Sequence, residues 1–78
     1  MQKTLEELGK EYLESAKTIE ALIKKYRGIL REAYSSGNYL KTYDTKRRLT
    51  IFYDQKRELE AIGNKLINYY NKEDNSDE

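Results

Sequence analysis

The sequence lacks the residue types on which the commonest functional sites depend. It contains no cysteine and no histidine, which excludes a disulfide framework and a zinc or haem site of ordinary type. The usual Cys and His nucleophiles and bases of enzymes are missing as well. The 4 glycines are isolated from one another, so no glycine-rich loop can hold a phosphate. We therefore expect a protein that is not an enzyme and that binds no metal ion, no cofactor and no small-molecule substrate.

Long hydrophobic runs are absent too. No run of apolar residues is longer than three, whereas a membrane-spanning helix needs about 20. The first residues also lack the hydrophobic core of a signal peptide. From these absences we expect a cytoplasmic protein with no membrane partner.

Charge and tyrosine are plentiful, and proline is absent. Charged residues make up 37% of the chain and hydrophobic residues another 37%, with 8 tyrosines among them. The 15 basic and 14 acidic residues nearly cancel, which removes the high net charge typical of disordered chains. This composition predicts long amphipathic helices, and a length of 78 residues predicts one domain.

The first helical pattern covers residues 4–35. Thr4 and Glu7 have the spacing of a capping box, in which two side chains bind backbone N–H groups at the helix start. Apolar residues then recur at alternating spacings of three and four and form a stripe about 160° wide. Leu13 and Ala21 are the apolar residues that we place outside the stripe. Beside its main seam runs a row of Gly9, Ala16, Ile23 and Leu30.

The second helical pattern covers residues 39–71 and follows a break at residues 35–38. Gly37 stands where a left-handed residue commonly ends a helix, and Asn38 is a good N-cap for the next one. After residue 71 there is no apolar residue. Residues 72–78 are therefore predicted to form a disordered acidic tail.

Three polar residues, Arg48, Gln55 and Lys56, interrupt the stripe of the second pattern. Their long stems can cover the seam while their heads reach water. Alternatively, they form a polar layer that sets the register of an assembly, or they line a ligand pocket.

So short a break makes consecutive helices lie side by side and antiparallel. We therefore predict an all-α fold in which residues 1–71 form a helical hairpin domain. Folding the chain about residue 37 places Gly9 level with Gly63, where missing side chains let backbones approach. It also places Tyr12 near Ile62.

A lone hairpin covers only about half of so broad a stripe, because each helix buries just the strip that touches its neighbour. A second copy would cover the rest and give a four-helix bundle, with the hairpins parallel or antiparallel. We expect a homo-oligomer, with a dimer favoured. The predicted self-association interface comprises Leu5, Leu8, Tyr12, Ile19, Leu22, Ile23, Tyr26, Leu30, Leu49, Phe52, Leu59, Ile62, Leu66 and Tyr70.

Charge is unevenly distributed along the chain. Residues 24–57 hold ten basic and three acidic residues, whereas residues 1–23 and 58–78 are both net acidic. In a hairpin the basic block occupies the turn, and basic residues mixed with aromatics are typical of nucleic-acid binding. An acidic protein partner, or the acidic ends of a second copy, would explain the asymmetry equally well. The candidate basic tip comprises Arg27, Arg31, Lys41, Lys46, Arg47, Arg48 and Tyr39.

These patterns lead to one functional expectation and one alternative. We expect a small non-enzymatic helical protein that acts through self-association and protein–protein interaction, in an accessory or regulatory role. The alternative is a nucleic-acid-binding module that uses the basic tip.

Overall fold

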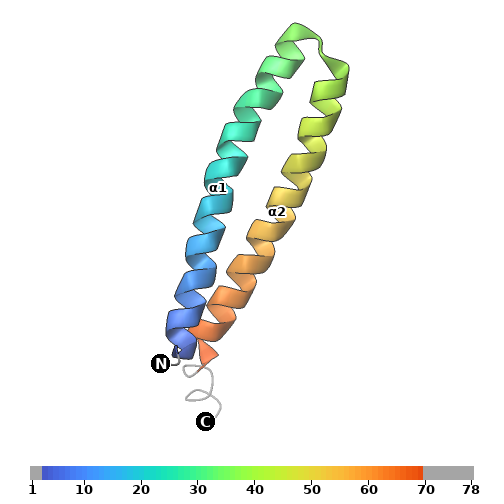
Figure 1. Ribbon diagram of the computed structural model, residues 1–78. Coiled ribbons are helices and arrows are strands. Elements are labelled where there is room, and N and C mark those ends of the chain that lie inside the picture. The colour runs from blue at the N-terminus through green and yellow to red at the C-terminus, as the bar shows by residue number, and fades with distance from the viewer. Residues whose placement is uncertain (1–2, 70–78) are drawn as a thin grey trace.

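The computed structural model describes residues 3–69, which form two α-helices and, in that range, no strand (Figure 1). Helix α1 runs from Leu5 to Ser36 and helix α2 from Tyr39 to Ile67. The two helices lie antiparallel and side by side over their whole length. The predicted all-α hairpin is confirmed.

The helix boundaries agree with the sequence prediction except at the end of α2. That helix ends at Ile67, where Asn68 caps it with a ψ of 4°. The backbone N–H of Asn68 still donates to the carbonyls of Asn64 and Leu66. Beyond Asn68, Tyr69 is again helical, and residues 70 and 71 of the predicted second helix lie outside the described residues, as does the predicted tail.

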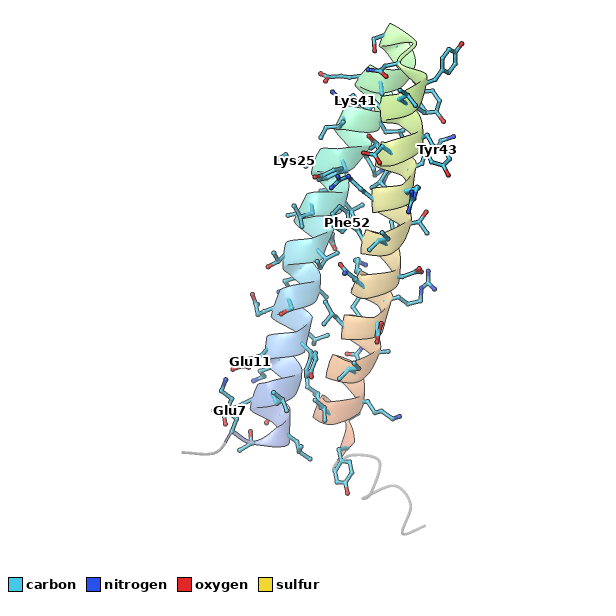
Figure 2. The ribbon with its side chains drawn as sticks, turned by 45° about the vertical axis from the view of Figure 1, so that its right-hand side comes forward. Glu7, Glu11, Lys25, Lys41, Tyr43 and Phe52 are labelled. Carbon is cyan, nitrogen blue, oxygen red and sulfur yellow. The ribbon has the colours of Figure 1, made fainter. Side chains whose placement is uncertain are left out.

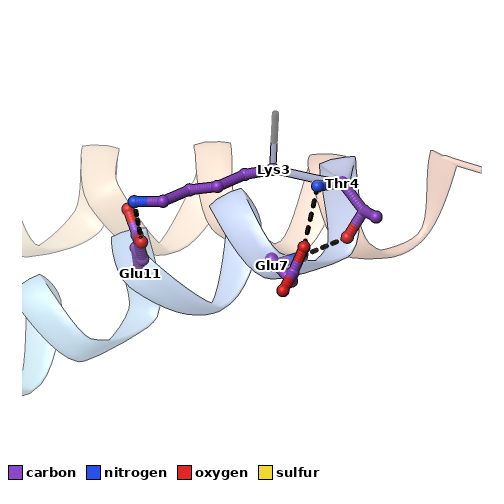
Figure 3. Close-up of polar contacts among 4 residues, drawn as sticks. All are labelled: Lys3, Thr4, Glu7 and Glu11. Atoms are coloured by element: carbon purple, nitrogen blue, oxygen red, sulfur yellow. Dashed lines mark hydrogen bonds and ion pairs between the residues drawn. The ribbon is translucent and has the colours of Figure 1, made fainter. Parts of the chain in front are cut away.

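Helix α1 begins with the predicted capping box (Figure 3). The backbone N–H of Glu7 donates to the hydroxyl of Thr4 at 3.0 Å. In return, the backbone N–H of Thr4 donates to the carboxylate of Glu7 at 2.9 Å. This backbone hydrogen bond, with help from the Thr4 hydroxyl, lowers the pKa of Glu7 below its ordinary value of 4.5. Figure 3 also shows an ion pair between Lys3 and Glu11.

The turn has the geometry that Gly37 and Asn38 predict. Gly37 is left-handed, with a φ of 70°, and its N–H donates to the carbonyl of Tyr34 at 3.2 Å. The N–H of Asn38 donates to the carbonyl of Ala33 at 3.0 Å. The side chain of Asn38 then accepts from the N–H of Lys41 at 3.1 Å and begins α2.

The seam between the helices is built mainly from small residues. Among the described residues, no large side chain is fully buried. Ile23 and Leu49, at 4% and 6% exposure, are the largest that come close. The buried residues of the two helices are Gly9, Ala16, Ile23 and Ala33 in α1 and Thr45, Leu49 and Gly63 in α2.

The two backbones touch at Gly9 and Gly63. The prediction that these two glycines lie at the same level of the hairpin is confirmed. A Cβ added to Gly9 would lie 2.7 Å from the carbonyl oxygen of Gly63 and 2.7 Å from a side-chain carbon of Ile67. A Cβ added to Gly63 would lie 2.8 Å from the side chain of Leu13. Leu13, which the sequence placed outside the apolar stripe, therefore packs inside the hairpin. The prediction was wrong because the close approach brings the flank beyond Gly9 into contact with α2.

Nearer the turn, two aromatic side chains meet across the seam. The rings of Tyr26 and Phe52 meet edge to face, with centroids 5.2 Å apart and planes at 69°; Figure 2 labels Phe52 on α2. Such aromatic pairs contribute about 0.5–1.5 kcal/mol beyond the area that they bury. The seam therefore combines a backbone contact at the open end, where α1 begins and α2 ends, with an aromatic pair in its turn half.

The contact at Gly9 predicts that even one added methyl group destabilises the hairpin. Gly9→Ala should lower the free energy of unfolding by about 1–3 kcal/mol, because the methyl group meets backbone atoms that cannot move independently. Gly28→Ala is the matched control, since a Cβ there has nothing within 4 Å. It should raise the free energy of unfolding by about 0.5–1 kcal/mol through helix propensity alone. Urea unfolding measures both, and equal effects would contradict the close approach.

The capping box predicts a specific dependence of stability on pH. Because the pKa of Glu7 is lowered in the folded state, its ionised form stabilises the fold above the ordinary carboxyl pKa. That contribution disappears as the pH falls through the folded-state pKa. The difference in unfolding free energy between the wild type and Glu7→Gln should therefore shrink on acidification below pH 4.5. In a Thr4→Ala background, the effect of Glu7→Gln on the unfolding free energy should vary less with pH. An effect of Glu7→Gln in the wild type that grows on acidification would refute the role of ionised Glu7 in the capping box.

Candidate interaction surfaces

One flank of the hairpin carries large apolar side chains that the seam leaves partly uncovered. Leu8 and Ser15 each precede a buried residue of α1, so they lie about 100° around the helix from the seam. Two adjoining shallow depressions run along this flank. We call this surface the side face; it comprises Leu8, Tyr12, Ser15, Gln55, Leu59 and Ile62.

Tyr12 and Leu59 are the centre of the side face because they line both depressions. The first depression adds Gln55, Glu58 and Ile62. The second adds Leu8, Glu11 and Ser15. The predicted proximity of Tyr12 and Ile62 is confirmed, since the two line one depression. An apolar floor with polar residues at its edges is suited to contact with another apolar surface.

The structure divides the predicted interface residues into three groups. Ile23 and Leu49 are buried between α1 and α2, so their apolar surface is used inside the hairpin. Leu8 is the most exposed, at 36%, and Tyr70 lies outside the described residues. The half-buried group comprises Leu5, Tyr12, Ile19, Leu22, Tyr26, Leu30, Phe52, Leu59, Ile62 and Leu66.

The polar residues that interrupt the second stripe lie in three different places. Lys56 lies in the seam with its side chain only 26% exposed, and its Nζ reaches the carboxylate of Glu60 at 3.1 Å. Arg48 is mostly exposed and pairs with Asp44 at 3.6 Å. Gln55 lines the side face. Lys56 therefore fits the interpretation of a stem that covers the seam while its head reaches a polar partner.

The hairpin tip, which we define as residues 34–48, exposes aromatic and aliphatic side chains. Tyr39 and Leu40 are 86% and 84% exposed, and Tyr43 and Tyr34 are 65% and 55% exposed. Figure 2 shows Tyr43 projecting from α2 near the turn. Sequence reasoning named Tyr39 but missed Leu40 as a surface residue. The sequence signal for the exposure of Leu40 was the weak apolar pattern of residues 39–46, in which the apolar residues do not line up on one face of the helix.

The predicted basic residues surround the tip and the adjoining part of α1. All six are exposed, and Lys46 lies over the ring of Tyr34, with its Nζ 5.1 Å from the centroid. Only Arg48 of the six has a carboxylate partner within residues 3–69. The cations without one are Arg27, Arg31, Lys41, Lys46 and Arg47.

These cations point in several directions. Lys41 and Arg48 are seven residues apart and share the flank that carries the side face. Lys46 follows the buried Thr45 and lies on the opposite flank, as its contact with Tyr34 requires. Arg47, one residue further, points away from α1, because successive helical residues turn by about 100°. The positive charge therefore encircles the end of the rod instead of lining one face.

Metal ligation and membrane crossing have no visible basis in the part of the chain that the structure describes. No group of three acidic side chains converges there. Neither α1 nor α2 combines the length and hydrophobicity needed to cross a bilayer.

Comparisons with family models, with curated proteins and with solved structures find no significant match to this chain. The side face and the tip are the two surfaces through which this hairpin can contact other molecules.

Proposed function

We propose that this is a small non-enzymatic cytoplasmic protein that forms a homodimer through its side face. In this proposal the dimer acts by protein–protein contact, in an accessory or regulatory role. The observation that carries the proposal is the placement of Leu8, Tyr12, Leu59 and Ile62 on a flank that the two helices leave partly uncovered.

The small apolar area buried in the seam supports the proposal energetically. Chains below about 80 residues rarely gain more than about 3–5 kcal/mol from a single core. Here the seam is built around glycine, alanine and threonine, which bury little apolar area. The larger side chains on the flank stay half in water in the single hairpin. Covering them would add about 25 cal/mol for each Å² of apolar surface removed from water.

A second copy is the simplest cover for the side face. Two hairpins that pair through this flank make a four-helix bundle with two-fold symmetry, so each residue of the face is used twice. The alternating apolar spacing of α1 is the spacing that such bundles bury. Glu58 and Glu11, at the edges of the depressions, would remain at the rim of the interface, where charges stay hydrated.

Sedimentation equilibrium tests the assembly directly. We expect a species of twice the 9.3 kDa chain mass, with a thermal midpoint that rises with protein concentration, as linked dimerisation requires. A monomer that unfolds cooperatively at a concentration-independent midpoint would refute the proposal.

A pair of variants tests which face is used. Leu8→Gln should weaken the dimer about tenfold or more, because a two-fold interface loses a partly buried leucine from each copy. Tyr53→Gln is the matched control: Tyr53 is similarly exposed, at 42%, but follows Phe52 onto the opposite flank. The dissociation constant of the control should be unchanged. Equal weakening by the two variants would exclude the side face as the interface.

The alternative function, nucleic-acid binding by the basic tip, stays a prediction. Positive charge on all sides of the tip does not point specifically to nucleic-acid binding, since strand-binding proteins align their cations along one groove. Oligonucleotide binding is one outcome of the experiment on the tip below.

A further inference from the structure

The tip presents apolar side chains at the extreme end of the molecule. Tyr39 and Leu40 occupy the first turn of α2, directly after the turn at Gly37 (Figure 1). They are the most exposed large apolar residues among those described, at 86% and 84%. The adjacent depression, which Leu40 lines with Lys41 and Tyr43, is shallow and open. The surface therefore has no opposing wall that would enclose a small ligand.

Unpaired positive charge lies just behind these side chains. Lys41 follows Leu40 immediately, and Arg31 is five residues before Ser36, the last residue of α1. At about 1.5 Å per residue, both lie within about 10 Å of Gly37 along the rod, which is about one Debye length at an ionic strength of about 0.1 M. Neither has a carboxylate partner among residues 3–69. Lys46 and Arg47 lie slightly further back.

We propose that the hairpin tip binds end-on to the surface of an anionic lipid bilayer. Leu40 and Tyr39 enter the interfacial region, and the cations around the rod contact the charged headgroups. A leucine beside lysine and arginine is typical of side chains that anchor proteins at such interfaces, and tyrosine prefers the headgroup level. The cytoplasmic leaflet of cells carries the negative charge that these cations would bind.

The arrangement of the charges favours a bilayer over a nucleic acid. A planar surface that meets the end of a rod faces every side of it, so cations on both flanks and on the outer side all contribute. A nucleic-acid strand contacts one face and would leave several of them unused. Leu40 also has no ring to stack on a base and no group to bind one, whereas hydrocarbon accepts it without penalty.

This proposal modifies the expectation of no membrane partner, which rested on the absence of spanning segments. Surface binding needs no spanning helix, and the described residues contain none. The proposal is also independent of dimerisation, because Tyr39, Leu40 and Tyr43 do not line the side face. A failure of one proposal therefore leaves the other to be judged separately.

Co-sedimentation of the full chain with vesicles tests the proposal. We expect binding to vesicles that contain phosphatidylserine, weak or no binding to pure phosphatidylcholine, and loss of binding at high salt. Leu40→Gln should reduce the partition coefficient about tenfold, because it removes one apolar anchor. Ile51→Gln is the matched control, since Ile51 is a half-exposed aliphatic residue of the same helix away from the turn, and it should bind as the wild type does.

A second pair of variants tests the charges. Lys41→Gln should reduce the partition coefficient about fivefold, the effect of one cation near an anionic surface. Lys65→Gln makes the same charge change near the open end and should have no more than a small effect. Circular dichroism checks that each variant remains helical.

Three results would overturn the proposal. The first is no difference between phosphatidylserine and phosphatidylcholine vesicles, and the second is equal effects of Leu40→Gln and Ile51→Gln. The third is binding to a single-stranded oligonucleotide at salt concentrations that abolish vesicle binding, with Leu40→Gln as active as the wild type. That third result would support the nucleic-acid alternative instead.

Discussion

The contact between the backbones of α1 and α2 at Gly9 and Gly63 is the constraint on which the rest of the structure depends. Two helices approach this closely only where side chains are missing, and a Cβ at either position would meet the other backbone within 3 Å. The approach turns the row of small residues toward the partner helix. Leu8 and Tyr12 consequently lie beside the seam, whereas Ile23 and Leu13 pack inside it.

The seam explains why the hairpin has two distinct surfaces to offer. Along the rod, the displaced side chains form the side face, an apolar flank whose extent exceeds what one neighbouring helix can cover. At the turn, Tyr39 and Leu40 begin α2 on the side that faces away from the seam, and they stay almost fully exposed. The first surface suits contact with another apolar helix face, and the second suits contact with the surface of an anionic bilayer. Each of the two proposed roles uses one of them.

In the described part of the chain, the charges differ between the two ends of the hairpin: ion pairs lie near the open end, and unpaired cations lie near the turn. Ion pairs such as Lys10 with Glu6 and Lys17 with Glu14 connect neighbouring turns near the open end, but exposed pairs of this kind contribute little to stability. Near the turn, several cations have no carboxylate to pair with among the described residues. These cations are available to bind an external anion. Folding by itself does not require unpaired cations at this end of the hairpin.

The sequence by itself determined what depends on neighbours along the chain. The Thr4 and Glu7 capping box, the left-handed Gly37 and the Asn38 cap follow from backbone hydrogen bonding within a few residues, and the short break dictated an antiparallel hairpin. Only the tertiary structure decided which row of the broad stripe faces the partner helix. That choice depends on how closely the backbones approach, and it placed Leu13 inside the hairpin and left Leu40 outside. Rotation of a helix about its own axis is set by packing across the seam, and apolar spacing along one helix does not specify it.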